Sequence, residues 1–456
     1  KIGDSVFHSC ENLQSINVDS NNSKYTSIDG ILFTKNMDTL LCFPANHPLS
    51  SYTIPTSVIS ISDSAFSHCV NLTSITIPTS VKSIGYSAFS NCSNLTSITI
   101  PVSVTSIDDY AFSYCSKLSS ITIPTSVESI GNSAFSNCSN LLSLTIPVSV
   151  TSIGNYAFSY CSKLSSITIP TSVTSIGNSI FENCRDLQTI IIPRSVTSIP
   201  PSTFSYCKNL KSIIIPTSVT SIGDSSFSYC SNLTSITLPL SVISIGKSAF
   251  SECSNLESVT IPTSVAILDD HAFSSCSMLQ SITIPRSVTK IGDSVFNYCD
   301  DLQSINVDSN NSKYISIDGV LFTKNLDTLL CFPENHPFSS YTIPTSVISI
   351  GDSAFSNCFN LTSITIPTSV KSIGDSAFSN CSNLLSLTIP KSVTSIGNYA
   401  FYSCLNLSKI AIPKSVTLIG SHTFESCSNL KTLTIPTSIK LIGDFVFSQC
   451  SNLQSI

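Results

Sequence analysis

The sequence predicts a β-rich repeat solenoid, and three regularities support this fold class. Phenylalanine recurs every 23 residues from Phe66 to Phe296, and again from Phe355 to Phe447. A cysteine follows each of these phenylalanines, and also Phe7, after three residues. The residues between the anchors repeat with the same period. A fixed period of this length indicates one supersecondary unit that is stacked many times.

The first element of a representative unit is a short strand at residues 95–100. Apolar and polar residues alternate there, which is the period-2 pattern of a half-buried strand. Its isoleucines are predicted to face inward, whereas Ser97 and Thr99 are predicted to face solvent. Pro101 has no N–H group and cannot continue a strand ladder, so the strand is expected to end there.

A second extended piece and a turn are predicted to complete the unit. Val104 faces inward in the extended piece, and a single helical turn then carries Phe112 and Cys115 into the core. In other units a glycine such as Gly131 stands four residues before the phenylalanine and is interpreted as tolerating left-handed backbone. The side chain that follows it, such as Asn132, is interpreted as accepting free N–H groups of the helical turn. Each coil then contributes about eight apolar side chains to one core.

These residues carry a family resemblance. The pattern Leu-x-x-Ile-x-Ile-Pro-x-x-Val-x-x-Ile-Gly-x-x-Ala-Phe-x-x-Cys resembles the leucine-rich repeat of BspA-like surface proteins, in the Ser/Thr/Ile-rich form found in parasitic protists. The resemblance implies a right-handed leucine-rich-repeat array with one parallel strand on the concave side and one short helical turn per 23-residue coil. We expect residues 1–456 to form a single continuous solenoid of about 17 coils. Both ends fall within a unit and neither is an atypical cap, so we expect a fragment of a longer protein.

The repeat is interrupted twice by matching inserts. Phe7 to Phe66 and Phe296 to Phe355 are each 59 residues apart, which is one coil plus 36 residues. We expect islands at residues 17–52 and 306–341, each projecting as a β-hairpin, because apolar runs flank a polar loop. The sequence up to about residue 101 reappears 289 residues later, which indicates that the array grew by duplication.

Composition disfavours several classes of partner. The net charge is −6 with 11% charged residues and no basic block, so nucleic-acid binding is not expected. No apolar run approaches the roughly 18 residues that span a bilayer. Membrane attachment is therefore expected only through segments absent from this fragment.

The nineteen cysteines are predicted to be reduced. Seventeen occupy one inward position per coil, and the other two, Cys42 and Cys331, are equivalent positions in the islands. Side chains stacked in parallel point the wrong way for a disulfide torsion of roughly 90°. Buried thiols that act as small apolar groups are the favoured interpretation, and disulfides between adjacent coils are the alternative.

No catalytic, cofactor-binding or metal-binding residue is predicted. A catalytic site needs a nucleophile, a base and an orienting group in one pocket, but no histidine shares the period of the abundant serines. The sequence has no Gly-rich phosphate loop, no paired-carboxylate motif and no Cys-x-x-Cys pair. We therefore expect a protein that is not an enzyme and has no cofactor.

The outward strand positions form two columns of hydroxyl groups. Ser97 and Ser120 belong to one column, and Thr99 and Thr122 belong to the other. These columns could form a long binding surface for an extended protein or glycan. The alternative is a solvated, strand-compatible face that is uniform because of duplication. Water ordering by a flat threonine array is a further alternative, which the curvature implied by the resemblance weakens.

Two neighbouring coils interrupt the threonine column. Ile191 and Ile214 take the outward threonine position, and Arg194 and Lys211 place positive charge nearby. Adjacent exposed isoleucines with a basic rim are typical of a small contact site. The alternative is neutral drift, because isoleucine is a favourable strand residue.

The resemblance implies adhesion as the function. We expect a cell-surface or secreted protein that recognises a host extracellular-matrix or cell-surface protein, or a glycan, through the repeat array. Ten Asn-x-Ser/Thr sequons fit this interpretation, although a chain this rich in Asn, Ser and Thr also produces them by chance. The alternative is an intracellular protein-interaction scaffold, which reduced cysteines favour.

Overall fold

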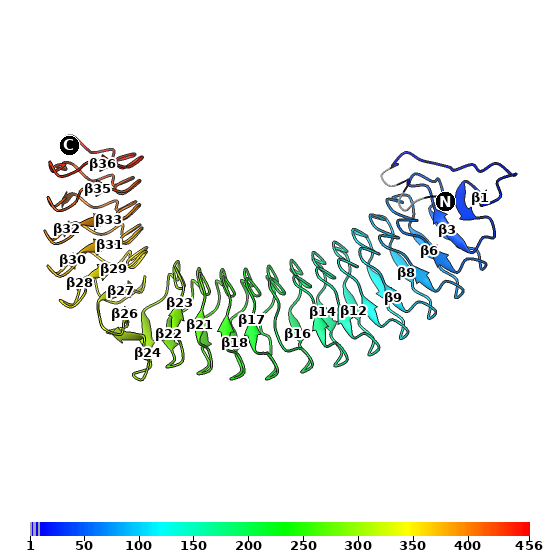
Figure 1. Cartoon of the computed structure of the whole chain (residues 1–456), viewed down its shortest axis with the longest axis horizontal. Helices are drawn as coiled ribbons and strands as arrows, with labels where there is room; N and C mark the ends of the chain where they lie inside the picture. Colours follow the sequence, from blue (N-terminus) through cyan, green and yellow to red (C-terminus); the bar gives the residue numbers. More distant parts are fainter. Residues whose placement is uncertain (1, 3–5, 8–9) are drawn as a thin grey trace. The chain divides into compact units, whose positions relative to one another are not determined.

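The computed structural model describes residues 2, 6–7 and 10–456, and residues 1, 3–5 and 8–9 lie outside the described part. The chain divides into two compact units, unit 1 (Lys1–Leu233) and unit 2 (Thr234–Ile456). In both units, coils follow one another along the chain, and most regular coils contribute one three-residue and one two-residue strand (Figure 1).

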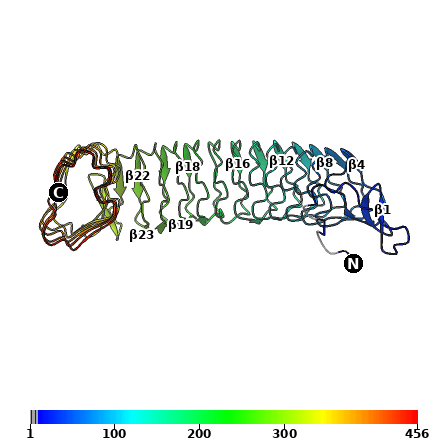
Figure 2. The same ribbon diagram turned by 90° about the horizontal axis from the view of Figure 1, so that it is seen from above.

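The described residues of unit 1 form seventeen strands. The island strands are β1 (Tyr25–Ile28), β2 (Ile31–Thr34) and β3 (Thr39–Cys42). The longer coil strands are β4 (Ser51–Thr53), β6 (Ser74–Thr76), β8 (Ser97–Thr99), β10 (Ser120–Thr122), β12 (Ser143–Thr145), β14 (Ser166–Thr168) and β16 (Thr189–Ile191). The shorter ones are β5 (Ser60–Ile61), β7 (Ser83–Ile84), β9 (Ser106–Ile107), β11 (Ser129–Ile130), β13 (Ser152–Ile153), β15 (Ser175–Ile176) and β17 (Ser221–Ile222). Figure 2 shows β4, β8, β12 and β16 along one edge of this unit.

Unit 2 repeats this organisation. Its island strands are β25 (Tyr314–Ile317), β26 (Val320–Thr323) and β27 (Thr328–Cys331). The longer coil strands are β18 (Ser235–Thr237), β20 (Ser258–Thr260), β22 (Ser281–Ile284), β24 (Ser304–Val307), β28 (Ser340–Thr342), β30 (Ser363–Thr365), β32 (Ser386–Thr388) and β34 (Lys409–Ala411). The shorter ones are β19 (Ser244–Ile245), β21 (Ile267–Leu268), β23 (Lys290–Ile291), β29 (Ser349–Ile350), β31 (Ser372–Ile373), β33 (Ser395–Ile396), β35 (Leu418–Ile419) and β36 (Leu441–Ile442).

The strands of adjacent coils pair in parallel and in register. Strand β8 pairs with β10, so that Ser97 lies beside Ser120 and Thr99 beside Thr122. Ile98, between them on β8, is buried while its two neighbours are exposed. The alternation follows from the pleat, which points successive side chains to opposite faces. The predicted parallel solenoid, with one such strand in most coils, is confirmed.

The predicted helical turn is wrong. No residue that the structure describes is helical, and in the regular coils from Cys69 onward the segment before the cysteine is a run of tight turns. Ser133 and Asn137 have left-handed backbone with φ of 51° and 61°. The N–H groups of Ser133 and Phe135 donate to Asn155 and Ala157 carbonyl oxygens of the next coil, each at 2.8 Å. Because alternate N–H groups bond between coils, they cannot form the ladder within the segment that a helix requires.

Two further predictions are wrong, namely the roles of the glycines that stand four residues before the phenylalanines and of the residues that follow these glycines. Among the described glycines only Gly30 and Gly319, in the islands, have positive φ. Gly154 is required by close stacking instead, since a Cβ atom there would lie 2.6 Å from the backbone nitrogen of Asn132. The Asn132 Oδ1 atom accepts a hydrogen bond from the N–H of Asn155 at 2.8 Å. It therefore caps the following coil and not a turn of its own coil.

Stacked phenylalanines run through the core of the coils. The ring centroids of Phe89 and Phe112 are 5.4 Å apart, and the rings are nearly parallel, with 1° between their planes. Parallel ring stacking adds to the burial of the large apolar surface of each ring. The coil of Phe112 buries eight apolar side chains: Leu95, Ile98, Ile100, Val104, Ile107, Ala111, Phe112 and Cys115.

The buried cysteines that follow the stacked phenylalanines also form hydrogen bonds between coils. The Cys115 Sγ atom lies 3.1 Å from the carbonyl oxygen of Phe89, and the Cys161 Sγ atom lies 3.2 Å from that of Phe135. Each thiol therefore donates to a backbone carbonyl of the preceding coil. Burial raises the pKa of Cys161 to about 12, because the core disfavours a thiolate.

We expect the buried thiols to resist alkylation in the folded protein. Since burial raises the pKa of Cys161 to about 12, its thiolate is scarce at any pH near neutrality. Iodoacetamide followed by peptide mass spectrometry should leave Cys161 unmodified at about pH 8.5, while the exposed Cys10 reacts. Denaturant should make both react. Rapid modification of Cys161 in the native state, or a disulfide at this position, would contradict the packing described above.

The two islands have the same internal structure. In unit 1, β1, β2 and β3 pair antiparallel in sequence, and β3 then pairs in parallel with β5. In unit 2, β25, β26 and β27 do the same before β29. Each island also returns a phenylalanine to the core, since Phe43 stacks on Phe66 at 5.2 Å and Phe332 stacks on Phe355 at 5.1 Å.

Candidate functional site

The isoleucine pair lies on the outward face of unit 1. Ile191 ends β16, pairs with Thr168 on one side and forms a parallel bridge with Ile214 on the other. Ile191 is 71% exposed and Ile214 is 78% exposed. The inward neighbours Ile190, Ile192, Ile213 and Ile215 are buried. Large apolar side chains therefore stand in solvent side by side, at positions that threonine occupies in the preceding coils.

The basic residues flank this pair along the chain. Arg194 follows β16 after two buried residues, Ile192 and Pro193, and Lys211 precedes the segment that contains Ile214. Both side chains are exposed. Arg194 lies beyond the C-terminal end of its strand and Lys211 before the N-terminal end of the neighbouring one, so the isoleucine pair has a basic residue at either end.

The hydroxyl columns are real structural features but do not converge on the isoleucine pair. Ser97, Thr99, Ser120 and Thr122 are exposed on β8 and β10, in register with one another. Thr145 and Thr168 stand between Thr122 and Ile191 in the column sequence. The predicted residues thus share one face of unit 1 but form two separate groups on it.

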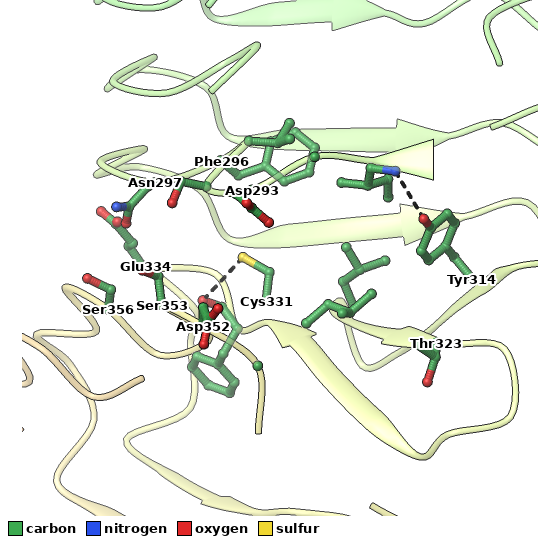
Figure 3. Close-up of a pocket in the computed structure, with 18 residues that line it drawn as sticks. Asp293, Phe296, Asn297, Tyr314, Thr323, Cys331, Glu334, Asp352, Ser353 and Ser356 are labelled. Atoms are coloured by element: carbon green, nitrogen blue, oxygen red, sulfur yellow. Dashed lines mark hydrogen bonds between the residues drawn. The ribbon is translucent and has the colours of Figure 1, made fainter. Parts of the chain in front are cut away.

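A second candidate site lies in unit 2, where the phenylalanine stack is interrupted. Phe296 stacks on Phe273 at 6.2 Å, and Phe332 stacks on Phe355, but in the described chain Phe296 and Phe332 have no ring contact. A cavity of about 370 Å³ lies at this point, and both Phe296 and Phe332 line it (Figure 3). Its size is in the range of small-ligand pockets.

Glu334 is the most unusual residue of this cavity. Its side chain is only 5% exposed. Its Oε1 atom accepts hydrogen bonds from the Tyr298 backbone N–H at 2.7 Å and from the Asn357 Nδ2 atom at 3.0 Å. Its Oε2 atom is buried without a hydrogen-bond partner. Burial raises the pKa of Glu334 to about 7, with a smaller contribution from the charge of Asp300.

The sequence analysis missed Glu334, although the duplication contains the signal. The two islands are nearly identical, but the unit 1 position that corresponds to Glu334 is Ala45, in Phe-Pro-Ala-Asn-His-Pro against Phe-Pro-Glu-Asn-His-Pro. Ala45 is buried, as Glu334 is. An acidic residue that replaces alanine at a buried position of an otherwise copied segment marks a place where the two islands can differ in function.

The described part of the chain holds no group of three or more His, Cys, Asp or Glu side chains that could bind a metal ion. Nor does it contain a helix with the length and apolar character to cross a membrane.

The coil length, the parallel three-residue strand of most coils and the inward Leu/Ile positions define a leucine-rich-repeat protein. The family assignment is more specific. The chain belongs to the family described as BspA type leucine rich repeat region (6 copies), whose model matches residues 1–40, 40–153, 128–239, 198–325 and 330–456. The resemblance found in the repeat pattern is thereby confirmed.

The chain is similar to solved structures of leucine-rich-repeat proteins. A leucine-rich-repeat protein from Bacteroides ovatus is 28% identical, with a TM-score of 0.54 over 96% of this chain and 100% of that one. A leucine-rich cell-surface protein from Faecalibacterium prausnitzii is 26% identical, with a TM-score of 0.40 over 91% and 95%. A leucine-rich-repeat protein from Eubacterium ventriosum is 24% identical, with a TM-score of 0.38 over 79% and 72%. No curated protein matches the chain significantly.

Proposed function

We propose that this chain is a non-enzymatic adhesion protein of the cell surface. It binds a host extracellular-matrix protein, a host cell-surface protein or a glycan through the strand-bearing face of its repeats. The observation that carries the proposal is the exposed pair Ile191 and Ile214, which interrupts the column of exposed threonines in unit 1. Membership of the BspA-type family supports a binding role for the array.

The physical reason is the cost of exposing apolar surface. Binding of a partner over a neighbouring pair of exposed isoleucines is favourable, because it removes their apolar surface from water. Buried apolar anchors of this kind dominate the energetics of protein interfaces. Arg194 and Lys211 stand at either end of the pair and can meet acidic groups of the partner. The flanking serine and threonine columns offer hydroxyl groups for hydrogen bonds beyond the anchors.

Replacing both isoleucines by threonine is expected to weaken adhesion. The variant Ile191→Thr/Ile214→Thr restores the threonine column and leaves the buried neighbours unchanged, so the fold should remain stable. Each lost anchor should reduce binding by about 1–2 kcal/mol. Binding to a panel of immobilised matrix proteins and to host cells would measure the loss.

A matched control is available on the same unit. Val148 is 78% exposed but stands alone after Pro147, so Val148→Thr removes a similar apolar area outside the pair. Adhesion should be unchanged in this control. Equal adhesion by the double variant and the wild type would place the ligand elsewhere on the array, and a wild type that adheres to nothing in the panel would refute the adhesion proposal.

An intracellular scaffold is the second candidate. It is favoured by the buried thiols of residues such as Cys115 and Cys161, since cytosolic conditions keep cysteines reduced. An antibody against the chain distinguishes the candidates. It should label intact cells if the protein lies on the cell surface, and only permeabilised cells if the protein is a scaffold.

A further inference from the structure

The cavity of unit 2 is lined by backbone donors whose counterparts in an interior coil have acceptors. In an interior coil, the N–H groups of Ser133, Phe135 and Asn137 all donate to carbonyl oxygens of the next coil at 2.8 Å. The corresponding donors at the island are Ser294, Phe296 and Tyr298. Only Tyr298 has an acceptor, and that acceptor is the Glu334 side chain.

The other two donors differ from their counterparts in the interior coil. Within the described chain, the N–H groups of Ser294 and Phe296 have no hydrogen-bond acceptor. Both residues line the cavity. Phe296 is buried and Ser294 is half-buried. An N–H group that is shielded from water and has no acceptor is unfavourable, so a bound group that supplies carbonyl or carboxylate oxygen would be stabilised here.

The cavity is lined by acidic side chains and by no basic ones. Glu334, Asp293 and Asp352 line it, whereas its lining residues include no lysine, arginine or histidine. The unpartnered Oε2 atom of Glu334 is a free acceptor in this acidic environment. Figure 3 shows Glu334 between Asn297 on one side and Ser353 and Ser356 on the other. A positively charged donor is the group that this arrangement favours.

The remaining wall is apolar. Phe296, Leu321, Leu330 and Phe332 contribute to it. A ligand that fits all three features therefore has a cationic head, an aliphatic stem and a nearby carbonyl or carboxylate oxygen. Long basic side chains bury their methylene groups against apolar surface while the charged head finds polar partners.

We propose that this cavity binds a basic amino acid, either free or as a residue of a polypeptide. The ammonium or guanidinium group donates to the Oε2 atom of Glu334, with Asp293 and Asp352 adding to the attraction. The carbonyl or carboxylate oxygen accepts from the N–H groups of Ser294 and Phe296. This proposal does not depend on the adhesion surface, which lies in unit 1.

Binding should depend on pH through Glu334. Burial raises the pKa of this carboxyl to about 7, so it is largely protonated in mild acid and ionised in mild base. A cation binds the ionised form, and the affinity should fall about tenfold between about pH 8 and about pH 6. The titratable groups that face Glu334 are Asp293, Asp300 and Asp352, together with the thiols of Cys299, Cys331 and Cys358. Burial raises the pKa of these thiols, so they stay neutral over this range.

Calorimetric titration of the full chain tests the proposal. The probes are L-lysine, L-arginine, the blocked peptide N-acetyl-Gly-Lys-Gly-amide, and L-norleucine, which lacks the charged head. We expect lysine or arginine, free or in the peptide, to bind and norleucine not to bind. Binding by the free amino acids identifies a small ligand, and binding by the peptide alone identifies a polypeptide partner.

Variants connect the binding to Glu334. Glu334→Gln should reduce the affinity for the bound probe by about thirtyfold or more, because it removes the charge that pairs with the cation. Glu334→Ala introduces the residue found at the same position of the other island, so it is expected to fold. Glu257→Gln, an exposed acid of unit 2 that does not line the cavity, is the charge-matched control and should bind as the wild type does.

Three results would overturn the proposal. Norleucine could bind as tightly as lysine, the Glu334 variants could keep the wild-type affinity, or the wild type could bind none of the probes at about 1 mM. The wild-type comparison of lysine with norleucine remains decisive even if a variant fails to fold. In the third case the two N–H groups are satisfied by solvent.

Discussion

Replacing Phe158 by alanine is expected to destabilise unit 1 by about 3–5 kcal/mol. Phe158 is completely buried, and its ring stacks on Phe135 at 5.6 Å and on Phe181 at 5.7 Å. The substitution removes the ring from both stacks and leaves a cavity that the neighbouring coils cannot fill without breaking their register. In a repeat array the loss also weakens the coupling between adjacent coils, so unfolding should become less cooperative.

Urea denaturation followed by circular dichroism measures this effect. Tyr160→Ala is the matched control, because Tyr160 lies two residues away and its side chain is 44% exposed. The control should change stability by no more than about 1 kcal/mol. A loss of similar size in both variants would mean that the stacked column contributes no more than an exposed ring.

The inward and outward positions could be predicted because they depend only on the repeat. Every interior coil packs between two nearly identical neighbours. Equivalent positions in different coils therefore have the same surroundings and the same burial. That is why Ile98 is buried, and why Ser97 and Thr99 are exposed, as the alternation predicts. The same alternation places Ile191 and Ile214 at the outward position of the threonine column, and both are exposed.

The turn segment could not be predicted from local propensity. Serine and tyrosine rarely adopt left-handed backbone, yet Ser133 and Tyr160 do so, with φ of 51° and 61°. Their conformation is held by hydrogen bonds to the next coil, which exist only after the coils have stacked. The role of Gly154 has the same origin, because the atoms that exclude a side chain belong to the preceding coil.

The cavity in unit 2 depends on still longer-range structure. Its walls come from the turn of Phe296, the island that contains Glu334 and the turn of Asp352, which are separated by many residues. The pattern could show that an island interrupts the repeat. It could not show that two backbone donors would lose their acceptors, or that the carboxyl group of Glu334 would replace the acceptor of a third.

The pH dependence of stability is expected to report directly on Glu334. Burial raises the pKa of this carboxyl from 4.5 to about 7, so the folded protein disfavours its ionised form. The resulting penalty is absent below about pH 4.5, grows as the pH rises to about 7 and is complete above it. This rise in pKa corresponds to about 3 kcal/mol, so the wild type should lose about that much stability relative to Glu334→Gln across this range.

The comparison with Glu334→Gln isolates this group from the other carboxyls. Glutamine can still accept the Tyr298 N–H but does not titrate, so the difference between the two proteins removes every shared pH effect. Denaturation at a series of pH values, with hydrogen exchange of the turn that contains Tyr298 as a local readout, measures it. Glu257→Gln should instead follow the wild type at every pH, because Glu257 is exposed. A stability difference between the wild type and Glu334→Gln that stays constant from acid to neutral pH would show that Glu334 is ionised without penalty. In that case a counter-charge or solvent reaches its Oε2 atom in the folded protein.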